Sequence, residues 1–264
     1  MNRRLLLVLM LTVSSTVIDT DAMYDAVNKR DRLGYTRLMR AVHNRNIVLA
    51  GELLDARANT ESQTKQDGHT ALHIAAKIGS TGCTELLIAA DANTLARDTQ
   101  GNTPLILALL ASQRDTAECL IRNGHAFALT RANNRGITPL MAAARMGLVE
   151  IVMNLTRINA GINAVAQDGG TAFLEAAQNI PASSMHALGK RFNKPLVDAI
   201  RWDIAARPPA DPRPYVACAG ILLRKGAVIN PTINQETALK RALRHQAPWA
   251  ALMAALGVDQ SSAE

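Results

Sequence analysis

Threonine recurs along the chain at a nearly constant spacing, each time just before a short apolar run. The positions are Thr36, Thr70, Thr103, Thr138 and Thr171, which are separated by 34, 33, 35 and 33 residues. Stretches such as "DGHTALHIAAKIGS" and "RGITPLMAAARMGL" repeat the same order of turn, threonine and apolar residues. A further match, "QETALKRALRHQ", places Thr237 another 66 residues on. A fixed period of about 20–50 residues is typical of repeat architectures, and it constrains this fold more than any other feature.

Each unit is predicted to be a helix, a turn and a second helix. The threonine can cap the first helix, and a proline directly after it, as at Pro104 or Pro139, suits the first helical position. A glycine precedes most of the threonines by two residues, where a turn favours a positive φ. Alanine pairs such as Ala75–Ala76 let neighbouring helices approach closely. Since no unit can bury its apolar face alone, the units are expected to stack into a solenoid.

With these features the chain resembles the ankyrin-repeat family, whose units read Gly-x-Thr-Pro-Leu-His-x-Ala-Ala, then Leu-Leu and Gly-Ala. The resemblance covers roughly residues 31–257 and implies an all-α solenoid of about six helix-turn-helix units, with an irregular insertion in the fifth. Aromatic residues make up only 3% of the chain, which agrees with small helices and argues against a β-sandwich. The motif proline remains only at Pro104 and Pro139, and the motif histidine only at His73. The first and sixth units are therefore expected to act as caps.

The resemblance also implies where a partner binds. Ankyrin solenoids present a broad concave face made of turn tips and first helices. Transfer of the family's contact positions predicts partner contacts at Arg32, Leu33, Tyr35, His43, Asn44, Gln66, Asp67, His69, Lys77, Thr99, Gln100, Asn102, Leu110, Asn134, Arg135, Ile137, Arg145 and Met146. Apolar members of this set among polar neighbours would form a mixed patch suited to protein recognition.

The fifth unit is interrupted. Its Leu222–Leu223 pair follows Thr171 by 51 residues, whereas the equivalent step from Thr70 to Leu86 is 16. The excess lies at about 180–215 and contains six of the ten prolines in the chain. Within it, "NKPLVDAIRWDIAAR" is predicted to be an amphipathic helix and "PPADPRP" a stiff extended linker.

Two interpretations of this segment stay open. It is either a repeat that lost its motif or an insertion that shapes the binding surface, because insertions in repeats map to loops that often lie on the binding side. On the second interpretation Arg201 and Trp202 are candidate partner contacts, with Phe192 and Tyr215 of the same type.

The first residues, "MNRRLLLVLMLTVSSTVIDTDA", are typical of a signal peptide. Arg3 and Arg4 precede an apolar run, and small residues suited to cleavage end at Ala22. The apolar run is far shorter than the ~20 residues of a membrane-spanning helix. We expect a leader at 1–22, a repeat domain at 23–257 and a disordered tail at 258–264, with export to the bacterial periplasm. A buried N-terminal helix is the alternative.

His69 and His73 have the four-residue spacing of a metal-binding pair on one helix face. The repeat frame argues against a metal, because His69 falls in the turn before the helix and His73 at the motif position. The resemblance implies that His73 bonds between neighbouring turns. No Gly-x-Ser-x-Gly, P-loop or dinucleotide-binding motif occurs. We expect no catalytic residue, metal or cofactor, and keep a metal-dependent hydrolase as the alternative.

The net charge indicates the chemical class of the partner, and the cysteine content bears on the core. The net charge of +7 favours acidic partners, while the scattered Lys and Arg residues, not interleaved with aromatics, do not indicate nucleic acid. Cys83, Cys119 and Cys218 lie in apolar contexts and are expected to pack in the core, although one disulfide stays possible.

The expected function is a non-catalytic protein-interaction scaffold that is monomeric until bound. Exported bacterial ankyrin proteins of this size resemble two kinds of protein. One kind consists of immunity proteins that neutralise a secreted effector such as a type VI phospholipase. The other supports oxidative-stress defence alongside a catalase. The sequence leaves both of these roles open and does not identify the partner protein.

Overall fold

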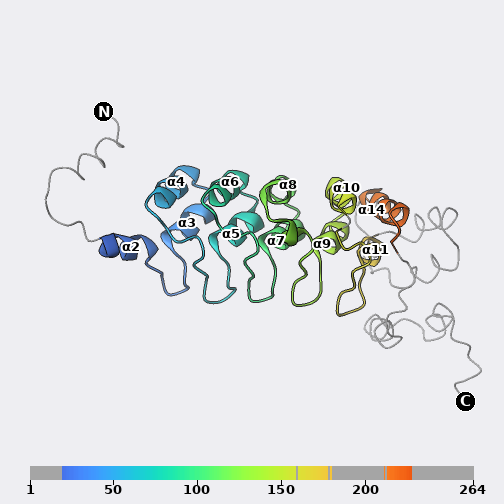
Figure 1. Cartoon of the computed structure of the whole chain (residues 1–264), viewed down its shortest axis with the longest axis horizontal. Helices are drawn as coiled ribbons and strands as arrows, with labels where there is room; N and C mark the ends of the chain where they lie inside the picture. Colours follow the sequence, from blue (N-terminus) through green and yellow to red (C-terminus); the bar gives the residue numbers. More distant parts are fainter. Residues whose placement is uncertain (1–19, 159, 178, 180–210, 212, 228–264) are drawn as a thin grey trace, which may run out of the picture.

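The computed structural model describes residues 20–158, 160–177, 179, 211 and 213–227. Within these ranges the chain forms helices joined by turns, and no strand occurs. Figure 1 shows pairs of helices standing side by side in a row, with long turns projecting from one edge. The predicted all-α solenoid of helix-turn-helix units is confirmed.

The helices form two layers. The inner layer comprises α3 (Arg37–His43), α5 (Ala71–Ile78), α7 (Pro104–Leu110), α9 (Pro139–Arg145) and α11 (Ala172–Ala177). The outer layer comprises α4 (Ile47–Asp55), α6 (Thr81–Ala89), α8 (Arg114–Asn123), α10 (Val149–Arg157) and α14 (Arg213–Arg224). A further helix, α2 (Thr20–Asn28), contacts α3 at the start of the row, and a 3₁₀ turn, η1 (Ala126–Leu129), follows α8. Each inner helix contacts the next inner helix and the outer helix of its own unit.

The repeated threonines begin the inner helices as predicted. The side-chain oxygens of Thr36, Thr70, Thr103 and Thr138 accept hydrogen bonds from the backbone N–H groups three residues on. Thr171 does the same for Leu174 at 3.3 Å. Pro104 and Pro139 occupy the first turns of α7 and α9, where the missing N–H has no helical partner to lose.

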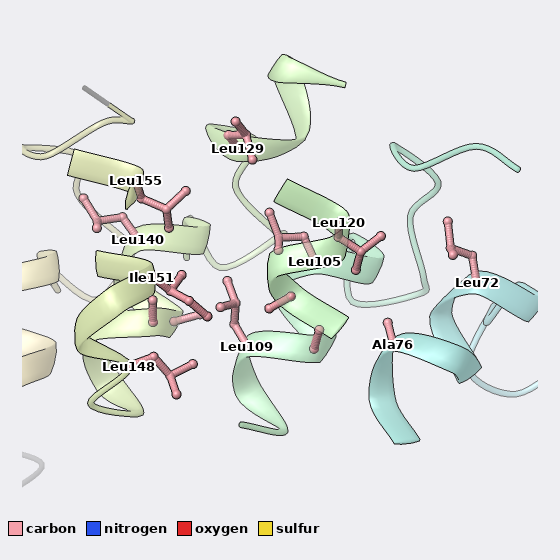
Figure 2. Packing of buried hydrophobic residues seen from close by; sticks show 14 of the residues in the cluster. Leu72, Ala76, Leu105, Leu109, Leu120, Leu129, Leu140, Leu148, Ile151 and Leu155 are labelled. Atoms are coloured by element: carbon pink, nitrogen blue, oxygen red, sulfur yellow. The ribbon is translucent and has the colours of Figure 1, made fainter. Parts of the chain in front are cut away.

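The core fills the space between the two layers. Figure 2 shows leucines of inner helices, such as Leu105 and Leu109, turned toward side chains of the outer helices, such as Leu120 and Ile151. The alanine pairs predicted to allow close approach are completely buried, as at Ala75 and Ala76. Burial of each such leucine contributes about 1.5–3 kcal/mol, so packing between the two layers, within units and between them, is a large stabilising contribution.

Two changes in the repeat period have local structural causes. The turn of the second unit, from Thr64 to Thr70, is one residue longer than the turn from Asp98 to Thr103. The exit of the third unit is enlarged by η1, which buries Leu129 and leaves Phe127 76% exposed. Beside this enlarged exit, α8 and α10 approach each other less closely than the other neighbouring outer helices.

The fifth unit is rebuilt after its interruption. Helix α14 contacts both α11 and α10, so it serves as the second helix of that unit. The linker predicted at "PPADPRP" is wrong for Arg213 and Pro214, which lie in the first turn of α14, where proline is tolerated. Tyr215 is half-buried, packs against the core and lies beside Gly147.

Several predicted segments lie outside the described residues. These are the apolar run of the leader, the bulk of the fifth-unit interruption with Arg201 and Trp202, the sixth unit at Thr237 and the tail. Helix α2 includes the expected cleavage position at Ala22. No helix in the described ranges has both the length and the apolar character needed to cross a bilayer.

Gly34 tests how strictly the turns are built. Its φ is +87°, and a Cβ there would lie 2.8 Å from the backbone nitrogen of Lys65 in the next unit. We expect Gly34→Ala to lower the free energy of unfolding in urea by about 1–3 kcal/mol. Gly51 of α4, in the same unit, is the matched control because a Cβ there meets nothing within 4 Å. Gly51→Ala should raise the free energy of unfolding by about 0.5–1 kcal/mol, and equal losses in both variants would contradict this account.

Candidate protein-binding face

The tips of the turns, at residues 31–34, 64–68, 98–101, 133–136 and 166–169, are joined in succession by backbone hydrogen bonds. The N–H groups of Lys65, Thr99, Asn134 and Gln167 donate to the carbonyls of Leu33, Asp67, Gln100 and Arg135 at 3.0, 2.9, 3.0 and 2.9 Å. Each bond links one unit to the next at the same place in the repeat. The tips therefore form a regular row and fix the spacing of the side chains that they carry.

Side-chain oxygens brace individual tips from within. One carboxylate oxygen of Asp31 accepts from the N–H groups of Leu33 and Tyr35, both at 2.9 Å. Asp98 and Asn133 repeat this pattern in the third and fourth units. Short polar side chains stabilise turns by such bonds to the backbone of following residues.

His73 ties two tips together, as the resemblance implied. Its Nδ1 accepts from the Thr70 N–H at 3.2 Å, and its Nε2 lies 3.1 Å from the Asn102 carbonyl of the next unit. Because a carbonyl only accepts, the ring proton sits on Nε2. Both ring nitrogens are thus occupied by the protein, which makes His73 a structural residue.

A hydrogen-bonded network of buried polar side chains continues from the bond between His73 and Asn102. The Asn102 side chain donates to Asp98 at 2.9 Å and accepts from the Asn133 amide at 2.8 Å. Asn102 is only 2% exposed. Asn102, which was predicted to contact a partner, is thus buried, and its polar atoms link the third and fourth units beneath the tips.

His69 is also buried, against the prediction. Its ring stacks on that of His73 with centroids 5.8 Å apart, and its Nε2 lies 3.6 Å from a carboxylate oxygen of Asp98. The residue is 7% exposed, so it supports the second tip and does not present itself to a partner. The two histidines come together although they share no helix face, because the turn before Thr70 folds back over α5.

Burial sets the protonation of this pair. It lowers the pKa of His73 to about 4, although the bond to Asn102 acts in the opposite direction. Burial and the nearby Lys77 ammonium lower the pKa of His69. Both rings are therefore neutral at neutral pH. Among the described residues, no three His, Cys, Asp or Glu side chains gather closely enough to hold a metal ion.

The remaining predicted contacts lie on the face formed by the tips and the inner helices. The exposed members are Arg32, Leu33, His43, Asn44, Gln66, Asp67, Lys77, Thr99, Gln100, Asn134 and Arg135. The partly buried members are Tyr35, Leu110, Ile137, Arg145 and Met146. Arg201 and Trp202 are outside the part of the chain that is described.

Arg145 has a structural partner that the sequence did not reveal. Its Nε donates to Glu175 at 2.9 Å, and the Glu175 side chain is almost completely buried. Asn179 donates to the Arg145 carbonyl at 3.1 Å. These contacts join the fourth and fifth units, so Arg145 contributes to the fold as well as to the face.

Two exposed cations of the face were missed in the sequence. Arg37 stands where the motif has proline, at the first position of α3. The Lys65 side chain lies over Gly34 of the preceding tip. The departure from the motif at Arg37 was the available signal, because an exposed arginine replaces a residue with no charge.

The three cysteines are buried and free. Burial raises the pKa of Cys218 to about 12 and also raises that of Cys119. Thiols of this kind are packing residues and poor nucleophiles. The disulfide left open by the sequence does not form.

The helix pairs, capped turns and inter-turn histidine define an ankyrin-repeat solenoid, which is a protein–protein interaction scaffold. Residues 38–130 match a family model of three ankyrin repeats, and residues 135–167 match the single ankyrin repeat. The chain is similar to neurogenic locus notch homolog protein 1 of Xenopus tropicalis, with 33% identity over 64% of this chain and 7% of that protein. Neurogenic locus notch homolog protein 2 of Homo sapiens is 34% identical over 48% of this chain and 5% of its own length. The chain thus spans only a small part of these relatives.

The buried histidines predict an acid-sensitive fold. A folded-state pKa below the unfolded value of about 6.5 means that the unfolded chain binds more protons in acid. The stabilisation is complete above pH 6.5 and is lost as the pH falls toward 4. For His73 this loss is about 3 kcal/mol in the free energy of unfolding, and His69 adds to it in the same direction.

Urea unfolding between pH 7 and pH 4 checks this prediction. His73→Gln keeps a donor for the Asn102 carbonyl but cannot titrate, so its stability should fall less steeply with pH than that of the parent chain. Identical pH slopes in the two proteins would show that His73 does not control the acid response.

Proposed function

We propose that this chain is a non-catalytic scaffold that holds a partner protein on the face formed by its tips and inner helices. The row of tips carries the proposal, because inter-unit hydrogen bonds hold exposed side chains at fixed positions. Leu33 is 61% exposed at the first tip, and Ile137 and Met146 are partly exposed in the fourth unit. Apolar side chains among polar ones on a rigid support suit protein recognition.

The proposal includes export. The basic and apolar N-terminal residues support delivery to the bacterial periplasm, with the mature chain beginning near Met23. In its finer form, the chain is an immunity protein that neutralises a secreted effector by covering it. The resemblance to exported ankyrin proteins of this size motivates that role, and it is equally compatible with oxidative-stress defence alongside a catalase.

A capture experiment tests the binding face. The double variant Leu33→Asp, Met146→Asp places charges on apolar positions of the proposed face. Val48→Asp, Met153→Asp is the matched control on outer helices α4 and α10, where Val48 is 73% and Met153 40% exposed. We expect the first variant to lose the captured partner and the second to retain it. Equal capture by both variants would place the binding site elsewhere.

The mature N-terminus tests export. Intact mass measurement of the periplasmic protein should give a chain that starts near Met23. Recovery of the chain in the cytosol with Met1 still present would contradict this part of the proposal.

A growth assay tests the immunity role. Periplasmic expression of the captured protein should arrest growth. Co-expression of the parent chain should restore growth, whereas co-expression of the double variant Leu33→Asp, Met146→Asp should not.

A further inference from the structure

Four cations on the candidate binding face of the first two units have no neutralising partner among the described residues. Arg32 lies on the first tip, Arg37 begins α3, Lys65 lies on the second tip and Lys77 lies in the last turn of α5. All four are exposed, and none forms an ion pair with a described residue.

The acidic groups nearby are engaged or outnumbered. Asp31 pairs with Arg40, and the buried Asp98 carboxylate faces His69. Asp67 is exposed on the second tip, with its carboxylate 3.9 Å from His69. The tips and inner helices of the first two units therefore present a strong excess of positive charge.

The positive charge is sparser in the third unit. Its tip carries Gln100, and Arg97 beside that tip is half-buried and donates to Asn134. The inner helix of this unit ends at the partly buried Leu110, in the position that Lys77 holds in the second unit. In the fourth unit Arg135 is exposed at the tip, while Ile137 and Met146 are partly exposed and the guanidinium of Arg145 is paired with Glu175. The face is thus basic toward the N-terminal end and more apolar toward the middle of the solenoid.

We propose that the occupant of this face is an acidic segment of a partner protein, with carboxylates over the first two units and apolar side chains over the third and fourth. This inference rests on the proposed function and names the chemistry of the partner. Exposed opposite charges steer association and set its orientation, which fits cations left unpaired in the free protein.

The observations favour a protein segment over nucleic acid. A phosphate backbone is contacted by an extended basic stripe, often with aromatic rings for the bases, but four of the exposed cations named on this face lie in the first two units and Arg135 follows only at the fourth tip. One side of the partly buried Tyr35 ring is already approached by the Arg40 guanidinium, at 6.0 Å from the ring centroid.

Fluorescence anisotropy with a defined probe tests the inference. The probe is a labelled 14-residue peptide whose first half alternates Glu and Ser and whose second half alternates Leu and Ser. The comparison peptide carries Lys in place of Glu. We expect the full chain to bind the Glu peptide at least tenfold more tightly than the Lys peptide at low salt, with the preference shrinking at high salt.

Two variants of equal net charge distinguish an effect of the cations on this face from an effect of the overall charge of the protein. The face variant is Arg32→Gln, Arg37→Gln, Lys65→Gln, Lys77→Gln. The control variant is Arg122→Gln, Arg157→Gln, Arg224→Gln, Lys225→Gln, at exposed positions near the ends of the outer helices. We expect at least a fivefold loss of Glu-peptide affinity in the face variant and less than a twofold loss in the control. Equal losses would overturn the inference.

A charge reversal keeps the test decisive. Arg37→Glu with Lys77→Glu should exchange the preference and favour the Lys peptide, with unchanged helical circular dichroism. Binding that depends on the four cations with a 20-base-pair DNA duplex or with phosphatidylglycerol vesicles, but not with the Glu peptide, would overturn the inference in favour of those surfaces. If the face variant still captures the protein lost by Leu33→Asp, Met146→Asp, the acidic segment is excluded while the proposed function stands.

Discussion

One backbone hydrogen bond between each pair of successive tips holds the candidate binding face together. At the first junction the Lys65 N–H donates to the Leu33 carbonyl, and the same bond recurs at the three junctions that follow. The bond forms only if the two tips lie in contact, and a glycine with positive φ permits that approach. Helix packing sets the distance between units, while these bonds set the register of the side chains that a partner would meet.

Beneath the tips, buried polar groups make the register specific. The chain from His73 through Asn102 to Asn133 spans three units, and each member is satisfied by a neighbour. An unsatisfied buried polar group costs about 1–3 kcal/mol, so a shifted register would be penalised at each link. At the motif position, Met39 and Met141 keep only the contact to the preceding threonine N–H, through sulfur. A thioether cannot donate to the next turn, which makes the second junction different from the others.

A rigid face lowers the entropic cost of binding, and an uneven distribution of charge on such a face favours partners of complementary charge. The supporting residues and the exposed ones have separate roles. Some side chains are buried and contact neighbouring residues of the solenoid, namely those of His69, Asn102 and Asp98. Others are exposed on the surface, namely those of Arg32, Arg37 and Lys77. This division explains why a position that contacts partners in the family need not do so here.

The sequence by itself determined the fold, because its local signals act within one unit. Threonine caps, glycine turns, Pro104 and Pro139 at first helical positions, and buried alanine pairs were all readable from a period of about 33 residues. Only the tertiary structure decided which tip residues are free. The period gives the place of a residue within its unit, but not what the next unit lays over it. His69 is covered by Asp98 and the His73 ring, and Arg145 pairs with a carboxylate 30 residues away. Those contacts arise from stacking between units, so they depend on two distant stretches of sequence at once.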